Sequence, residues 1–159
     1  MSELRKANTE GKVYFLTLTV VLWIDIFTRK EYCQILIESL RFCQKNKGLE
    51  LYAFCIMPSH VHLVASRKEE LLSDLLRDMK SFVAKEIIKK IDTGGFESRR
   101  EWLLHLFKFN AKYNSQNSTY MFWQKTSHPL EIISPEMMRQ KIRYVEENPL
   151  GAGRISDGS

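Results

Sequence analysis

The sequence lacks any apolar run that approaches the ~18 residues a membrane-spanning helix needs. Its first stretch, 1–12, is polar and contains no apolar signal segment. These two absences lead us to expect a cytoplasmic protein without a membrane partner. Repeats, low-complexity segments and a clear linker are also missing, and 159 residues suit one hydrophobic core. We therefore expect a single domain over 1–159, with residues 1–12 and 154–159 frayed.

Cysteine is scarce, and its spacing argues against cysteine-based sites. Cys33, Cys43 and Cys55 lie far apart, are odd in number, and form no C-x-x-C pair. A structural zinc site usually needs four nitrogen or sulfur ligands, so this spacing disfavours one. We expect three reduced thiols, as in a cytosolic protein.

The charge balance favours an anionic partner but does not identify one. The formal net charge is +5, a modest excess. Basic residues gather in the middle of the chain: Arg77, Lys80, Lys85, Lys89, Lys90, Arg99, Arg100, Lys108 and Lys112. Acidic residues are interleaved with them, so a solvated helix surface and a phosphate-binding surface both stay open. Phe122 and Trp123 can stack on bases, although their strand-like spacing favours a core position for one of them.

The apolar pattern predicts an α+β fold. Strands are expected at 13–23, 51–57, 60–66, 120–124 and 130–133, and helices at 28–47, 71–91, 97–112 and 134–147. In helix 97–112, the side chains expected to face inward are Trp102, Leu103, Leu106 and Phe109. Ser134 is a plausible N-cap for the last helix, with Pro135 in its first turn. The order of these elements predicts a ferredoxin-like split βαβ fold with an antiparallel sheet, a helical insertion and an added C-terminal helix.

Two histidines on one predicted strand are the most informative feature. In Met57-Pro58-Ser59-His60-Val61-His62-Leu63, His60 and His62 project from the same face, because successive side chains on a strand alternate. Two imidazoles on one face are half of a metal site for a divalent ion, which would polarise a phosphodiester. The alternative is that both are ordinary surface residues on a hairpin.

A tyrosine and an asparagine sit four residues apart in the last predicted helix. Tyr144 and Asn148 therefore share a helix face. Tyr144 is a candidate nucleophile, although a phenol is protonated at neutral pH and needs a nearby cation, metal or lysine, to ionise. Taken alone, Tyr144 can also be a half-buried packing residue, and Asn148 can simply cap the helix before Pro149.

Taken together, these residues resemble the single-tyrosine HUH transposases of bacterial insertion sequences, and most closely their REP-associated tyrosine transposase branch. The resemblance rests on three motifs: M-P-S-H-V-H-L at 57–63, F-W-Q at 122–124 followed by His128, and I-R-Y-V-E-E-N-P-L at 142–150. It spans most of the chain, from Tyr14 to about Ile155. The first and last motifs are specific in combination, whereas H-x-H alone is not.

The resemblance implies a metal-dependent enzyme of DNA transposition. It implies Mg or Mn held by His60, His62 and Asn148, and Tyr144 as the nucleophile that attacks single-stranded DNA. The expected products are a 5′-phosphotyrosine enzyme and a free 3′-hydroxyl, so a second 3′-hydroxyl can reseal the strand without ATP. The resemblance also implies recognition of a DNA hairpin beside the cleavage site, with repetitive extragenic palindromes as the target, and it allows a homodimer.

Three points stay open at the level of sequence. Relatives commonly continue beyond the N-P dipeptide, so if such a segment holds the tyrosine helix, we expect Tyr144 to be less firmly placed here. A non-catalytic hairpin-DNA-binding protein would keep the fold and the basic surface and use the histidines structurally. A replication or plasmid-relaxation initiator would use the same site on an origin.

Overall fold

An antiparallel sheet crosses the protein in the order β4-β1-β3-β2-β5. The structure is a computed structural model that describes residues 11–114, 119–147 and 152–153. The strands are β1 (Tyr14–Thr19), β2 (Leu49–Ile56), β3 (His60–Arg67), β4 (Leu130–Glu131) and β5 (Ala152–Gly153). The helices are α1 (Lys30–Asn46), α2 (Leu72–Thr93), α3 (Arg100–Asn114) and α4 (Pro135–Glu146), with 3-10 turns η2 (Val21–Trp23) and η3 (Ile26–Thr28).

The topology confirms the predicted ferredoxin-like plan. The chain runs β1-α1-β2-β3-α2 and, after the inserted α3, reaches β4, which pairs with the outer edge of β1. β1 and β3 are the central neighbours, and β2 pairs with the other edge of β3. The additions to this plan are α4 and β5, and β5 extends the sheet beyond β2.

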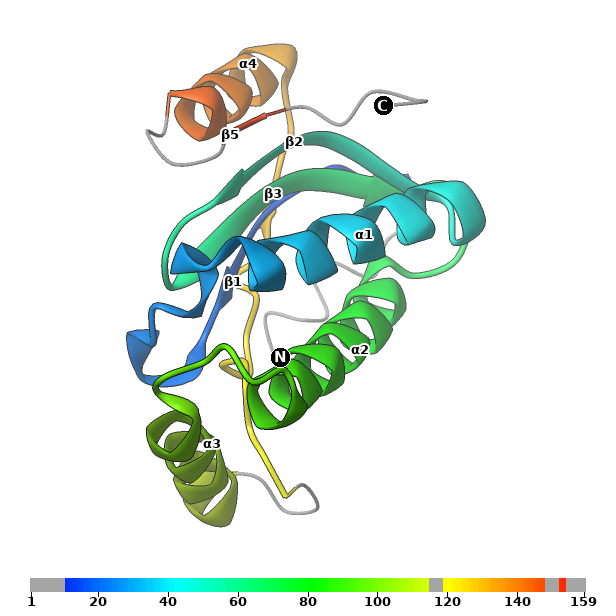
Figure 1. Ribbon diagram of the computed structural model, residues 1–159. Helices are drawn as coiled ribbons and strands as arrows, with labels where there is room; N and C mark the ends of the chain where they lie inside the picture. Colours follow the sequence, from blue (N-terminus) through cyan, green and yellow to red (C-terminus); the bar gives the residue numbers. More distant parts are fainter. Residues whose placement is uncertain (1–10, 115–118, 148–151, 154–159) are drawn as a thin grey trace.

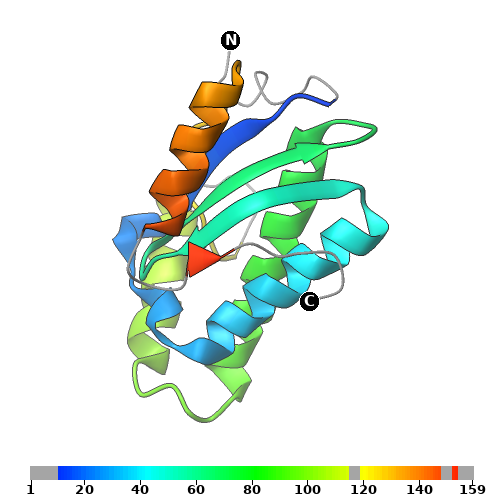
Figure 2. The same ribbon diagram turned by 90° about the horizontal axis from the view of Figure 1, so that it is seen from above.

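The two faces of the sheet are covered by different helices. α1 and α2 lie on one face and α4 lies on the other (Figures 1 and 2). Leu16, Leu18 and Leu63 belong to the main core that includes α1 and α2. Val64 and Val145 belong to a second, smaller cluster between the sheet and α4. Because side chains alternate along β3, His60 and His62 face the α4 side together with Val64.

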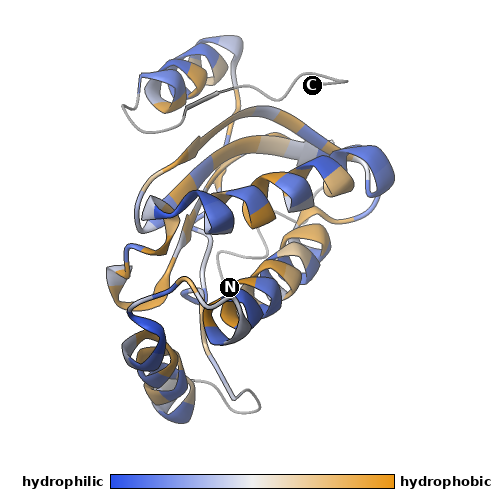
Figure 3. Cartoon of the chain, viewed as in Figure 1, coloured by the Kyte–Doolittle hydropathy of each residue, from blue (hydrophilic) through white to orange (hydrophobic). Residues whose placement is uncertain are grey.

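Burial on both faces agrees with the colouring of the elements by hydropathy. The central strands are mostly hydrophobic, whereas the helices alternate between hydrophilic and hydrophobic segments (Figure 3). Strands covered on two sides need apolar residues in successive positions, and helices covered on one side need them only on a stripe. None of the helices in the described ranges is both long and apolar enough to cross a bilayer.

The predicted strand over 13–23 is too long. β1 ends at Thr19, and Val20 makes only an isolated bridge to Trp123. The chain then turns sharply, with φ of 56° at Leu22 and 54° at Trp23. The β-branched residues continue past the sheet because Val20 and Val21 fill the core beside these turns, so composition alone overestimates the strand.

The predicted strand over 120–124 is also wrong. This segment crosses the end of β1: Val21 donates its N–H to the Phe122 carbonyl and Gln124 donates to the Thr19 carbonyl, each at 2.8 Å. Phe122 and Trp123 are 3% and 7% exposed, so both are core residues and neither presents a stacking surface.

The inward face of α3 agrees with the predicted one at Leu103 and Leu106 and differs from it at Trp102 and Phe109. Leu103 and Phe107 are fully buried, whereas Trp102 and Phe109 are about half exposed. The helix begins at Arg100, and the face it turns inward depends on α2 and the segment after it, which its own apolar residues cannot reveal. His105, also in α3, is exposed.

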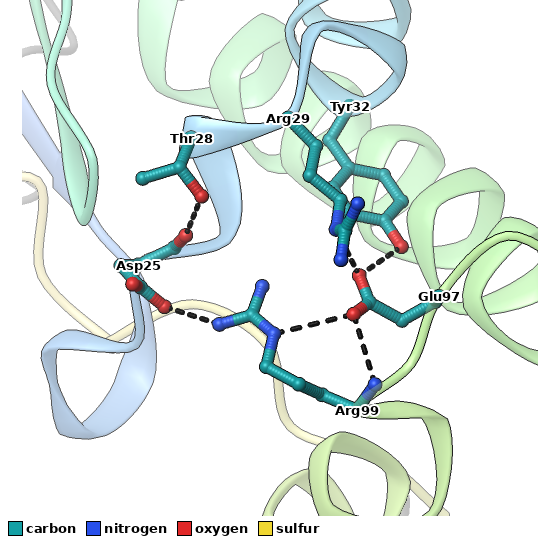
Figure 4. Close-up of polar contacts among 6 residues, drawn as sticks. All are labelled: Asp25, Thr28, Arg29, Tyr32, Glu97 and Arg99. Carbon is teal, nitrogen blue, oxygen red and sulfur yellow. Dashed lines mark hydrogen bonds and ion pairs between the residues drawn. The ribbon is translucent and has the colours of Figure 1, made fainter.

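A buried carboxylate holds the start of α3 against α1. The Glu97 side chain is fully buried and accepts a hydrogen bond from the Tyr32 hydroxyl at 2.9 Å (Figure 4). It also pairs with Arg29 at 2.9 Å and with the Arg99 guanidinium at 3.2 Å. Burial alone would raise the pKa of Glu97, but hydrogen bonds from the Arg99 N–H, Tyr32 and the Arg99 side chain outweigh it and lower that pKa. Arg99 continues the network to Asp25 at 2.6 Å.

We expect Glu97→Ala to lower the free energy of unfolding by about 2–4 kcal/mol, because it leaves the Tyr32 hydroxyl and two guanidiniums without their carboxylate. Urea denaturation measures this. Exposed Glu38, which only accepts a hydrogen bond from Gln34, is the matched control, and its replacement by alanine should change stability by less than about 0.5 kcal/mol. Equal stability of the two variants would contradict the role of Glu97. Because the pKa of Glu97 is lowered by folding, its contribution is complete above a pH of about 4.3 and is lost as the pH falls below it.

Candidate active site

The two histidines of β3 lie side by side on the face of the sheet that α4 covers. Their ring centroids are 4.8 Å apart. His62 is 7% exposed and stacks on Phe15 at 5.3 Å, while His60 is half-buried. The register of the sheet places Thr17 opposite His62 and Thr19 opposite His60. The pair is therefore held by the central strands of the sheet.

Neighbouring hydroxyls orient both rings. The Thr17 hydroxyl oxygen lies 3.1 Å from Nδ1 of His62, and the Ser59 hydroxyl oxygen lies 3.3 Å from Nδ1 of His60. Within the described residues these contacts engage Nδ1, which leaves Nε2 as the ring nitrogen better placed to bind a metal. A hydrogen bond to the ring nitrogen that does not bind the metal fixes the tautomer and the ring orientation of a metal-binding histidine.

Burial keeps both imidazoles neutral. It lowers the pKa of His60, and it lowers the pKa of His62 to about 4, assisted by the positive charges of His60 and Lys141. Neutral imidazole is the form that binds a metal, so neither ring has to lose a proton near neutral pH. The two imidazole nitrogens therefore suit a divalent first-row transition-metal ion such as Mn²⁺.

Helix α4 brings Tyr144 to the same side of the sheet. Its ring centroid lies 5.6 Å from His62 and 6.0 Å from Phe15, and the side chain is 54% exposed. The neighbouring Val145 is fully buried in the cluster between α4 and the sheet, and this anchors the helix. Tyr144 thus lies beside His62, and about half of its side chain is open to solvent.

The remaining residue predicted for the site, Asn148, lies outside the described residues. α4 ends at Glu146, and Glu147 is its C-cap. In the described part of the chain, no group of three or more His, Cys, Asp and Glu residues is arranged to hold a metal. The structure therefore brings together His60, His62 and Tyr144.

Lys141 is a site residue that the sequence interpretation missed. Its Nζ lies 4.9 Å from the centroid of the Phe15 ring, which also contacts His62 and Tyr144. A residue three positions before Tyr144 shares its helix face, so this spacing was a usable signal. The lysine places a positive charge close enough to His62 to help lower the pKa of that imidazole.

Trp23 was missed because it was assigned to a buried strand. It is 62% exposed and makes an edge contact with His60 at a centroid distance of 5.5 Å. Leu22 and Trp23 both have positive φ, a costly conformation for residues with large side chains. An exposed indole held in this way next to the histidines can stack on a nucleobase.

Comparisons with known proteins identify a family and a shared fold. The sequence model of a family described as "Transposase IS200 like" matches residues 24–115, which include both histidines. None of the curated proteins searched matches the chain.

The solved structures that resemble this one include two transposases. The first is a REP-associated tyrosine transposase bound to a REP hairpin, with 16% identity and a TM-score of 0.63 over 94% of this chain and 73% of that one. The second is a candidate transposase from Deinococcus radiodurans R1, with 20% identity and a TM-score of 0.50 over 84% of this chain and 88% of that one. At these identities the likeness shows a shared fold.

Proposed function

The chain belongs to the family of IS200-like transposases, and from this premise we propose that it cleaves single-stranded DNA and transfers strands through a 5′-phosphotyrosine on Tyr144. The observation that carries the proposal is the position of the Tyr144 ring, 5.6 Å from His62 and on the same face of the sheet as both histidines. A nucleophile and a metal-binding pair on the same face can act on one phosphodiester.

We further propose that His60, His62 and Asn148 hold a divalent ion, Mg or Mn. The two neutral imidazoles with engaged Nδ1 atoms support the first two assignments. When bound, the ion supplies a positive charge that polarises the phosphodiester and stabilises the charge developing on its oxygens. An amide oxygen from Asn148 would shift the preference toward the harder ions.

The chemical step uses the hydroxyl of Tyr144. Its phenolate oxygen attacks the phosphorus, forming the tyrosine–phosphate bond as the bond to the 3′-oxygen breaks. The phenolic proton passes to solvent, and the departing 3′-oxygen takes up a proton to become a hydroxyl. Lys141 lies on the same helix face as Tyr144, with its Nζ over the Phe15 ring that Tyr144 also contacts. In the reverse step another 3′-hydroxyl attacks the phosphorus and loses its proton to solvent. A new phosphodiester forms as the tyrosine–phosphate bond breaks, the phenolate takes up a proton, and no ATP is needed.

The proposed partner is a single-stranded DNA that folds into a hairpin next to the cleavage site. The fold is shared with a transposase bound to a REP hairpin, which supports extragenic palindromic repeats as targets to try first. The proposal includes a homodimer. The family resemblance allows Tyr144 to act in the active site of its own subunit or in that of a partner subunit, and the second arrangement requires a dimer.

The test is to incubate the protein and Mn²⁺ with a hairpin that carries single-stranded flanks, labelled at either the 5′ or the 3′ end. The phosphotyrosine retains the DNA downstream of the cut. We therefore expect the 3′ label in a protein adduct on a denaturing gel and the 5′ label in a shorter free strand. EDTA should remove both products. A shift seen only on a native gel would instead identify a non-catalytic hairpin-binding protein.

A further inference from the structure

We propose that a lysine-lined groove between α2 and residues 119–125 binds the phosphate backbone of the DNA that flanks the cleavage site. The groove has a volume of about 850 Å³ and is lined by Lys80, Lys85 and Lys89 of α2 and by Lys125 on the opposite wall. This inference rests on the proposed function, since it assigns the binding surface for the same substrate.

The structure distinguishes the three arginines of the middle segment from the lysines that line the groove. The arginines are paired: Arg77 with Asp74 and Asp78, Arg99 with Glu97 and Asp25, and Arg100 with Asp92. The four lysines of the groove make no ion pair within the described residues. Asp92 is the acidic side chain that lines the groove, and its charge is already matched by Arg100. The groove therefore carries uncompensated positive charge, which attracts phosphates.

Lys80 is built into the wall of the groove. Its Nζ donates to the Gln124 carbonyl at 3.2 Å, and the Trp123 indole N–H donates to the Lys80 carbonyl at 3.0 Å. Burial lowers the pKa of Lys80 to about 8, and no carboxylate in the described ranges counters that effect. A buried ammonium without an anion is costly, and a phosphate in the groove would supply one.

The shape of the groove favours the DNA backbone over its bases. Trp123 and Phe122 are buried, so they form the floor of the groove and offer no open face for stacking. Tyr120 is half-buried, and Lys108 lies 5.8 Å from the centroid of its ring, which adds a further cation near one end. Lysine ammonium groups on a closed apolar floor contact phosphates and carry little base specificity.

The segment that forms one wall of the groove continues along one edge of β1 toward the candidate active site. In this segment the Gln124 N–H donates to the Thr19 carbonyl at 2.8 Å. The Ser127 carbonyl accepts from the Thr17 N–H, also at 2.8 Å. On its other side β1 pairs with β3, placing Thr19 opposite His60 and Thr17 opposite His62. Two strand spacings, about 10 Å, thus separate this segment from the backbone of the histidine pair. In Figure 1 the yellow segment runs from the α2 side of the sheet to α4.

The test compares two charge-matched triple variants. K85Q/K89Q/K125Q removes exposed lysines of the groove, and K30Q/K45Q/K68Q removes exposed lysines elsewhere. Affinity for a hairpin with single-stranded flanks is measured at several salt concentrations. We expect the groove variant to bind about tenfold more weakly or worse, equally for hairpins of different sequence, with a salt slope reduced by about 2–3. The control variant should match the wild type.

Equal binding and equal salt slopes for the two variants would overturn the groove assignment, as would a wild type that does not bind the hairpin. Adduct formation by the wild type is scored separately. Lysine-dependent binding without any adduct would refute the tyrosine chemistry and leave the groove intact. Adducts formed by a protein whose affinity ignores these lysines would refute the groove alone.

Discussion

Replacing Tyr144 by phenylalanine should eliminate the covalent protein–DNA adduct while leaving hairpin affinity within about twofold of the wild type. The variant loses only the hydroxyl oxygen that would bond to phosphorus. The ring contacts with His62 and Phe15 are kept, and the side chain is 54% exposed, so neither the fold nor the metal-binding pair should change. A residual rate below about one thousandth of the wild type is expected, because a phenyl ring cannot act as a nucleophile.

The matched control for this variant is Tyr113→Phe. Tyr113 is 64% exposed on α3 and packs against Phe109, away from the histidines. Its replacement should leave adduct formation unchanged on the denaturing gel with the 3′-labelled hairpin. Persistence of the adduct in the Tyr144→Phe protein would exclude Tyr144 as the nucleophile and with it the proposed reaction.

Replacing His60 or His62 by alanine should lower metal-dependent cleavage by about 100-fold or more and weaken Mn²⁺ binding in parallel. Each imidazole would supply one of few protein ligands, so its loss removes an inner contact of the ion. His60 is the safer variant, because it is only half-buried, whereas His62 also packs on Phe15.

Two measurements separate a metal role from a structural one. Mn²⁺ affinity is read by titration calorimetry, and unfolding by urea shows whether the variant stays folded. His105 is an exposed histidine on α3, and His105→Ala should change neither quantity. A His60→Ala protein that is folded, binds Mn²⁺ normally and cleaves DNA would defeat the metal assignment.

Much of the fold was predictable from the sequence, because the signals involved are local. A strand with alternating side chains places His60 and His62 on one face whatever lies above it. The Ser134 hydroxyl accepts from the Met137 N–H at 3.1 Å, which confirms the N-cap expected from Ser134-Pro135. The order of strands and helices was enough for the ferredoxin-like topology, since few connections are compatible with it.

The predictions of secondary structure were wrong where contacts between segments distant in the chain determine the local conformation. The segments 20–23 and 120–124 have the composition of strands, yet they pack against each other at the end of β1. Composition measures how well a residue suits burial, and a turn inside the core suits the same residues as a strand. The exposed position of Trp23 beside His60 was invisible for this reason.

By itself the sequence determined most of the elements, their order and the two histidines that share a face, because these depend on residues close together in the chain. Only the tertiary structure decided that α4 covers the histidine face and brings Tyr144 and Lys141 to it. It also decided which cations are neutralised: Arg77, Arg99 and Arg100 pair with carboxylates, whereas the groove lysines make no ion pair in the described part of the chain. Both outcomes depend on contacts between side chains far apart in the sequence, and the interaction of two charges or two packed surfaces is set by their separation in space.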